Sequence, residues 1–449
     1  MLIINGKLIT WDEPNRVLDG QALNIVDGKI ARIGPQQNML SSYPDTEVLD
    51  ADGQYVMPGN ICAHTHFYGA FARGLAIPGP APKDFPEILQ KLWWPLDRSL
   101  RTEDVRASAQ VMLVDAVKHG TTTLIDHHAS PNAIEGSLDV IAEAVDNSGL
   151  RAVLCYEVTD RDGEAKAVAG IEENMRFIER TRQETVADGR VAATFGLHAS
   201  LTLSEKTLER CRQAAPDDVG FHIHVAEHEA DEYDSLAKSG KRVVDRLLSH
   251  QILGSQTIIA HAVHVDAREV ELLAETNTWV THQPRSNMNN GVGMAEVESI
   301  LRSGAPVCIG TDGFSHTMWE EWKTAYLVHK LWHRDPRRMN GMDIVRMGVY
   351  NNAGLAGVFF SEAPLGVLSP GAYADLIFVD YHPHTPLDEG NLPWQIIFGF
   401  NESMVTTTIV NGKVLMHNRQ LLTLDEEAIT KHAWELAPKV WERYHQQFV

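Results

Sequence analysis

Two patterns of apolar and polar positions alternate along the middle of this 449-residue chain. Short runs rich in apolar and β-branched residues are typical of buried strands, and longer segments with helical periodicity lie between them. The runs expected to form strands are residues 59–66, 121–127, 151–158, 191–198, 219–226, 256–262, 278–282 and 306–312. Eight such strands alternating with helices predict a parallel (β/α)8 barrel rather than an open sheet.

Helix signals between these runs support the alternation. Ser204 is placed to cap a helix that ends near residue 215, and Asp266 with Glu269 forms the capping box of another helix. A last helical pattern covers residues 426–448. In contrast, residues 67–102 are rich in proline, glycine and aromatic residues, and long connections of this kind commonly act as lids.

The two ends of the chain carry a different pattern. Residues 2–57 alternate apolar and polar positions around Asn-Gly and Asp-Gly pairs, which mark hairpin turns, and residues 365–417 repeat this style. Two such ends predict one small β-sandwich built from both termini. The predicted α/β fold therefore comprises a distorted TIM barrel over residues 58–364, a flanking sandwich from residues 1–57 and 365–420, and a C-terminal helical extension over residues 421–449.

Composition restricts the possible ligands and the compartment. With 39 Lys and Arg against 60 Asp and Glu, the net charge of −21 disfavours nucleic acid and anionic lipid, and a small neutral or cationic ligand fits better. Three of the four cysteines lie in apolar runs, as expected of buried thiols in a reducing compartment. No signal peptide or membrane span is apparent, so a cytoplasmic protein without membrane contact is expected.

Histidines gather at the ends of the predicted strands. His64 and His66 stand one residue apart, so in a strand both side chains point to one face and can bind one metal ion. In a parallel barrel the later candidates lie at the same rim, where barrel active sites form. These candidates are His127, His128, His198, His222, His224, His261, His282 and Asp312.

A catalytic zinc or ferrous ion takes about three protein ligands of nitrogen or oxygen type and keeps one open position. The expected set is His64, His66, Asp312 and one histidine of the fifth strand. We prefer His224 in that strand, because Glu227 follows three residues later and can carry a proton beside the metal-bound water. His222 shares the same face and stays as the reserve ligand.

Residues just past the strand ends are candidates for binding the substrate. Spacing alone does not say which ring they would hold. They are Tyr68, Trp93, Glu157, Arg161, His198, Arg285 and Trp319.

Several short motifs together resemble the amidohydrolase superfamily. They are His64-Thr65-His66, His224-Val225-Ala226-Glu227, Ala260-His261-Ala262, His282-Gln283-Pro284-Arg285-Ser286-Asn287 and Gly310-Thr311-Asp312-Gly313. The resemblance covers nearly the whole chain and is to the branch that holds cytosine, guanine and S-adenosylhomocysteine deaminases and triazine hydrolases. Phrases such as Ile-Asp-His-His-Ala-Ser-Pro at residues 125–131 look most similar to SsnA-type aminohydrolases.

The resemblance implies one divalent metal per chain, most simply zinc, with Fe(II) as the alternative. It implies His64, His66, His224 and Asp312 as the metal ligands. Glu227 matches the family's ring-nitrogen proton donor, and His261 matches the residue that orients the attacking water. His198 matches a position that contacts substrate, and it stands where binuclear relatives carry a carboxylated lysine, so one metal is expected.

The expected reaction is hydrolytic deamination, which releases ammonia from an amino-substituted heterocycle of the purine, pterin or pyrimidine type. Hydrolysis of a cyclic amide or ureide, or of a triazine substituent, stays open as an alternative, as does a non-catalytic metal-binding scaffold. Residues 67–74 lack an amide side chain for reading a purine edge, which argues against guanine itself. The edge strands of the sandwich and the aromatic lid would be exposed in a single chain, and a second chain could cover them. They therefore favour a homo-oligomer.

Overall fold

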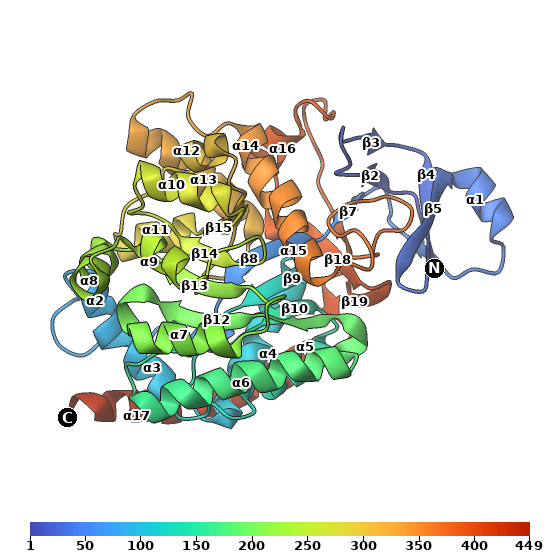
Figure 1. The fold of residues 1–449 in the computed structure, drawn as a ribbon. Helices are drawn as coiled ribbons and strands as arrows, with labels where there is room; N and C mark the ends of the chain where they lie inside the picture. Colours follow the sequence, from blue (N-terminus) through green and yellow to red (C-terminus); the bar gives the residue numbers. More distant parts are fainter.

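The computed structural model describes residues 1–449, and its centre consists of two parallel sheets surrounded by helices (Figure 1). One sheet has the strand order β11-β10-β9-β8, and the other has the order β12-β13-β14-β15-β16. The predicted α/β class with parallel strands is confirmed, and each of the predicted runs contains a strand. The strands are β8 (Asn60–Thr65), β9 (Thr121–Asp126), β10 (Arg151–Leu154), β11 (Val191–Ala193), β12 (Phe195–Ala199), β13 (Phe221–Val225), β14 (Ile258–His261), β15 (Trp279–His282) and β16 (Val307–Ile309).

Two isolated parallel bridges join the two parallel sheets. One joins Thr65 of β8 to Asp312, which follows β16, and the other joins Val158, which follows β10, to Leu197 of β12. Next to the first bridge, the backbone nitrogen of Asp312 donates to the carbonyl of His64 at 3.0 Å. Gly310 permits this approach, because a Cβ atom there would lie 2.6 Å from the backbone nitrogen of His64. Two segments far apart in sequence are thereby fixed side by side at one rim.

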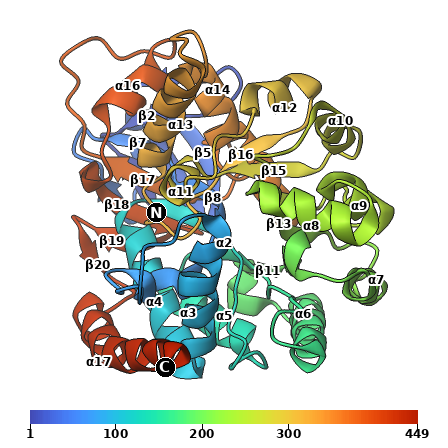
Figure 2. The ribbon, with the colours of Figure 1, turned by 90° about the vertical axis from the view of Figure 1, so that its left-hand side faces the viewer.

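Helices cover the outer faces of the parallel sheets, and Figure 2 shows α2, α8 and α11 on the face turned toward the viewer. Ser204 caps α7 by accepting from the backbone nitrogen of Thr207, and Asp266 with Glu269 forms the capping box of α10, as predicted. None of the helices has both the length and the apolar character that crossing a membrane requires. The main helices are α4 (Thr102–Lys118), α5 (Ser137–Ser148), α6 (Glu164–Gln183), α7 (Glu205–Ala214), α8 (Glu229–Ser239), α9 (Val243–Ser249), α10 (Ala267–Glu275), α11 (Pro284–Asn290), α12 (Val297–Ser303), α13 (Met318–His333), α14 (Gly341–Val345), α15 (Asn352–Phe359) and α16 (Leu392–Gly399).

Strands from both ends of the chain share one further sheet, with the order β20-β19-β18-β17-β7-β2-β3. Its central strand β17 pairs antiparallel with β7 from the N-terminal part and with β18 from the C-terminal part. A four-stranded sheet with the order β5-β4-β1-β6 lies next to it, and Leu23, Phe378 and Ile409 belong to one buried apolar cluster between them. The strands are β1 (Leu2–Ile4), β2 (Lys7–Ile9), β3 (Val17–Leu18), β4 (Gln21–Val26), β5 (Lys29–Pro35), β6 (Val48–Asp50), β7 (Tyr55–Pro58), β17 (Leu376–Val379), β18 (Val405–Val410), β19 (Lys413–His417) and β20 (Gln420–Leu421).

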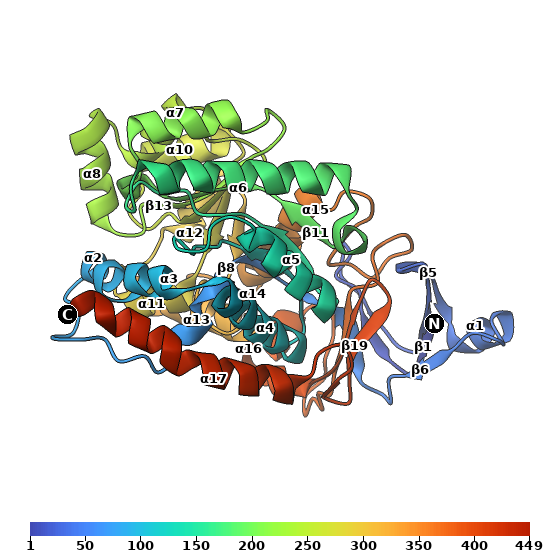
Figure 3. The ribbon, with the colours of Figure 1, turned by 90° about the horizontal axis from the view of Figure 1, so that it is seen from below.

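The segment after β8, which the composition suggested as a long lid, folds into short helices. They are η1 (Phe67–Ala72), α2 (Phe85–Ile88), η2 (Leu89–Trp93) and α3 (Trp94–Ser99). The last helix, α17 (Glu426–His445), lies along α3 and α4 on the outside of the molecule (Figure 3). Trp441 donates from Nε1 to the carbonyl of Phe71 at 2.9 Å, and Arg443 donates to the carbonyl of Ser99 at 2.7 Å. The C-terminal helix therefore packs against the outer side of this segment and is hydrogen-bonded to it.

Candidate metal centre and active-site pocket

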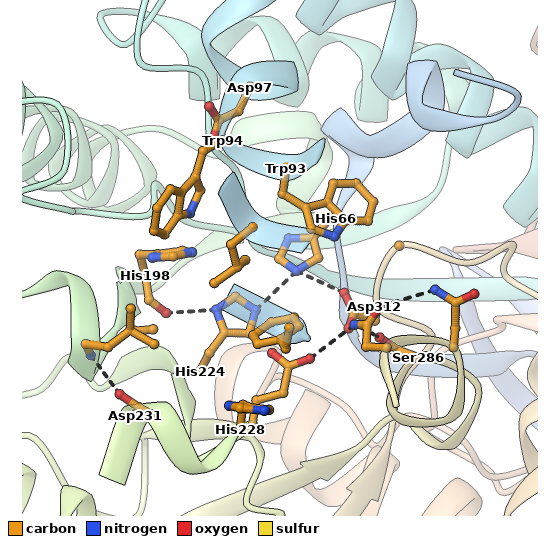
Figure 4. A pocket seen from close by; sticks show the side chains of 18 of the residues that line it. His66, Trp93, Trp94, Asp97, His198, His224, His228, Asp231, Ser286 and Asp312 are labelled. Carbon is orange, nitrogen blue, oxygen red and sulfur yellow. Dashed lines mark hydrogen bonds and ion pairs between the residues drawn. The ribbon is translucent and has the colours of Figure 1, made fainter. Parts of the chain in front are cut away.

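Three histidines and one aspartate converge at the rim where β8, β13 and β16 end. The Nε2 atom of His66 lies 3.2 Å from Nε2 of His224 and 3.2 Å from Oδ1 of Asp312 (Figure 4). The ligand atoms of His64, His66 and His224 lie within 4.8 Å of one another, and so do those of His64, His261 and Asp312. The structure thus brings together the four residues that the sequence predicts as metal ligands.

The hydrogen bonds of these histidines suit a metal ion. The Nδ1 atom of His66 donates to the carbonyl of His127 at 2.6 Å, and Nδ1 of His224 donates to the carbonyl of His198 at 2.8 Å. Because a carbonyl oxygen can only accept, each Nδ1 carries the proton and each Nε2 offers a lone pair. The Nε2 atom of His64 is buried and has no hydrogen-bond partner. Three such nitrogens and a carboxylate form a donor set that fits zinc or ferrous iron.

The backbone at this rim is held in a conformation that non-glycine residues seldom adopt. Left-handed φ angles occur at Ala226 (47°), His261 (78°), Ala262 (49°) and Asp312 (57°), at or just past the ends of three strands. At Asp312 the carbonyl accepts from the Thr65 hydroxyl at 3.0 Å, which helps to hold the turn. Strain of this kind persists only where the surroundings determine the geometry, and it clusters at functional sites.

Glu227 and His261 lie next to each other and close to Asp312, and Glu227 lines the pocket beside them. The Nε2 atom of His261 is 3.4 Å from Oε2 of Glu227 and 3.6 Å from Oδ2 of Asp312. Burial raises the pKa of Glu227 to about 7. A carboxyl group with that pKa exists in both protonation states near neutral pH, as proton transfer requires.

Two asparagines of α11 hold these side chains in place. Asn287 accepts from Nδ1 of His261 at 2.9 Å, and Asn290 donates to Oε1 of Glu227 at 3.2 Å. The sequence analysis gave neither residue a role. Their separation by three positions on a short helix was the available signal, because residues at that spacing share one helix face.

A pocket with aromatic walls opens beside the candidate metal centre, between the α2–α3 segment and helices α8 and α11. Figure 4 shows Trp94 and His198 on one side of it and Trp93 and Asp312 on the other. Its aromatic lining is Tyr68, Phe85, Trp93, Trp94 and Phe314.

The residues predicted to bind substrate divide into two groups. Tyr68, Trp93 and His198 line the pocket. His198 is held by the Thr202 hydroxyl, 2.8 Å from its Nδ1, and its Nε2 is 3.7 Å from Glu157, whose pKa burial raises to about 8.

The prediction that Arg285 binds substrate needs correction, because its side chain does not line the pocket. Its guanidinium donates to Glu320 at 2.7 Å and to the carbonyl of Ser315 at 2.7 Å, and it is also paired with Glu321. Of the other candidates, Arg161 and Trp319 do not line the pocket. Arg161 pairs with Asp97, and Trp319 packs against Phe400.

The remaining rim histidines bond to neighbours in the core. His128 pairs with the Ser130 hydroxyl at 2.8 Å, and His282 lies 3.1 Å from Nε2 of His329. His222, the reserve ligand, places its Nε2 atom 2.9 Å from Nδ1 of His64. It therefore contacts His64, one of the predicted metal ligands.

Known proteins resemble this chain over its full length. A 5'-deoxyadenosine deaminase of Methanosarcina acetivorans is 33% identical over 450 residues, covering 99% of each chain. A 5-methylthioadenosine/S-adenosylhomocysteine deaminase of Pelotomaculum thermopropionicum is 30% identical over 448 residues, again covering 99% of each chain. The crystal structure of an adenosine deaminase from Xanthomonas campestris with bound zinc has a TM-score of 0.85 at 22% identity, covering 98% of both chains. Residues 55–415 match the model of the amidohydrolase family, and the chain therefore belongs to this family, as its motifs indicated.

Proposed function

We propose that the protein is a metal-dependent hydrolytic deaminase that releases ammonia from an aminopurine nucleoside or a related amino-heterocycle. The observation that carries this proposal is the meeting of His64, His66, His224 and Asp312 beside Glu227 and His261. Aromatic walls suit a flat ring, and relatives that match over the full length are named for deaminating adenosine derivatives. These names favour a purine among the ring classes considered.

Zinc is the proposed ion, and His64, His66, His224 and Asp312 are the residues proposed to hold it. When bound, such an ion lowers the pKa of a coordinated water toward neutrality and so supplies the nucleophile. The donor set also accepts ferrous iron.

The protein's own side chains would manage the protons. Glu227 donates a proton to the ring nitrogen next to the reacting carbon, because attack is easier when negative charge need not build on that nitrogen. His261 orients the attacking water, and its Nε2 is 3.6 Å from Oδ2 of Asp312. Asp312 takes one proton of that water and passes it to the leaving amine, so that ammonia departs. The second proton leaves the new hydroxyl as the ring carbonyl forms and returns to Glu227.

Ammonia release from a panel of compounds tests the ring class. The panel contains 5'-deoxyadenosine, adenosine, cytosine, an amino-substituted pterin and an aminotriazine. Each compound is incubated with purified protein of measured zinc content. We expect turnover on the adenine nucleosides, seen as ammonia and as loss of the adenine absorbance band. Turnover confined to cytosine, the pterin or the triazine would contradict the proposal.

The pocket also predicts discrimination against anionic substrates. No lysine or arginine lines it, its acidic residues include Asp97 and Glu227, and Arg161 is already paired with Asp97. Because a phosphate would have to lose water there without a counter-charge, kcat/KM for adenosine 5'-monophosphate should be at least about 100-fold below that for adenosine. Steady-state ammonia assays on the two compounds measure this ratio, and comparable values would refute it.

Asn287 offers a further test of the proton path. Replacing it with leucine removes the acceptor that orients His261, so turnover should fall about tenfold while the metal content stays unchanged. Asn287→Asp keeps an acceptor oxygen at the same place and should retain most of the activity. Equal losses in the two variants would show that the hydrogen bond is not the cause.

We further propose the domain organisation, assembly and location. The two isolated bridges between the parallel sheets support a distorted (β/α)8 barrel over residues 58–364. The shared apolar cluster supports a β-sandwich from residues 1–57 and 365–420, with residues 421–449 as an extension. Exposed apolar side chains such as Leu331 (75%) and Trp434 (80%) favour a homo-oligomer. Four buried free cysteines favour a cytoplasmic location.

A further inference from the structure

A chain of buried polar groups runs from His64 away from the pocket. Nδ1 of His64 lies 2.9 Å from Nε2 of His222, and Nδ1 of His222 lies 3.9 Å from the sulfur of Cys155. That sulfur lies 3.5 Å from the backbone carbonyl of Asp126. His64, His222 and Cys155 are all fully buried, and the ring of His127 stacks on His222 with 4.3 Å between the ring centres.

The backbone carbonyl at the end of this series of groups determines which atom donates in each of the preceding hydrogen bonds. The carbonyl of Asp126 can only accept, so the Cys155 thiol donates to it. The sulfur then accepts from Nδ1 of His222, which leaves Nε2 of His222 with a lone pair. Nδ1 of His64 donates to that lone pair, and the Nε2 atom of His64 is left as an acceptor without a protein partner.

We propose that His222 and Cys155 are positioning residues that fix the tautomer and ring orientation of His64, so that its Nε2 lone pair faces the metal centre. This inference rests on the proposed function, in which His64 is a metal ligand. It gives His64 the outer support that His66 and His224 receive from backbone carbonyls. A side-chain relay is used here because Nδ1 of His64 faces the ring of another strand rather than a carbonyl.

The same residues would otherwise suggest a second metal site, since the ligand atoms of His127, Cys155 and His222 lie within 4.8 Å of one another. A metal ion on Nδ1 of His222 would need the lone pair there and would move the proton to Nε2. That proton would have to be donated to Nδ1 of His64, and a neutral His64 would then carry its own proton on Nε2. The second site and the use of His64 as a ligand therefore exclude each other, and the relay predicts one metal ion per chain.

Zinc binding by metal-free protein tests the relay. Affinity is measured by competition with a chromophoric chelator, and the number of ions per chain by elemental analysis. His222→Phe should bind zinc about 10–100-fold more weakly than wild type, as for other residues that support a metal ligand. His222→Gln, whose amide oxygen can accept from His64, should recover most of the affinity. Circular dichroism and thermal melting of the metal-free proteins control for folding.

Cys155 provides a second pair of variants that does not depend on the folding of His222→Phe. Cys155→Ser keeps a group that both donates and accepts and should bind zinc like wild type, whereas Cys155→Ala should bind more weakly. Equal affinities in the Cys155 pair, or wild-type affinity in a folded His222→Phe, would overturn the relay. Two zinc ions per wild-type chain, with one lost in Cys155→Ala, would overturn it in favour of a second metal site. A wild-type chain that binds no zinc would instead refute the proposed function.

Discussion

Glu227→Gln is expected to lower kcat for deamination by about 10²–10⁴-fold, the usual contribution of a positioned acid or base. Glutamine keeps the size of the side chain and an oxygen that can accept from Asn290. It cannot give a proton to a ring nitrogen, so the loss should fall on kcat, with zinc content and melting temperature unchanged. Ammonia release at saturating substrate measures the effect.

Glu229→Gln is the matched control for this variant. It removes the same charge two residues later, from an exposed position that does not line the pocket, and should leave kcat unchanged. Full turnover by a zinc-loaded Glu227→Gln would show that the proton comes from another group.

Asp312→Asn is expected to have the second large effect, because Asp312 has two proposed roles. The amide cannot take a proton from the attacking water, and it is a weaker metal ligand than a carboxylate. We expect kcat to fall by about 10²–10⁴-fold even at zinc concentrations that saturate the site. Zinc affinity should fall as well, which chelator competition measures separately from turnover.

Asp217→Asn controls for the loss of one negative charge, since Asp217 is fully exposed and pairs only with Arg212. It should match wild type in both assays. If saturating zinc restored wild-type kcat to Asp312→Asn, Asp312 would be a ligand alone, and the proposed proton transfer would be wrong.

The sequence predicted the strands, and the convergence of the proposed metal ligands, because both depend on local signals. Each parallel strand is a short apolar run, and the proposed ligands lie at the carboxyl ends of those runs, as His64 lies near the end of β8 and His66 directly after it. In a parallel arrangement, residues at the carboxyl ends of strands meet at one rim, so their convergence can be predicted without knowing any side-chain contact.

Contacts between distant segments could not be predicted in this way. Arg285 follows a strand end, yet Glu320 and Glu321 on α13 bind its guanidinium and hold it away from the pocket. The proposed support of His64 by His222 and Cys155 joins β8, β13 and the residue that follows β10, and no spacing along the chain indicates it. The short helices of residues 67–102 depend on packing against α17, which begins more than three hundred positions later.

Ammonia release from 5'-deoxyadenosine, followed before and after removal of the metal, tests the central claim most directly. The same preparation is assayed as purified, after treatment with a chelator, and after titration with zinc. A metal-dependent deaminase loses turnover with the metal and regains it in proportion to zinc, reaching a maximum at one ion per chain. Turnover that persists in the metal-free protein would contradict the account, as would a chain with one bound zinc that releases no ammonia from any aminopurine nucleoside.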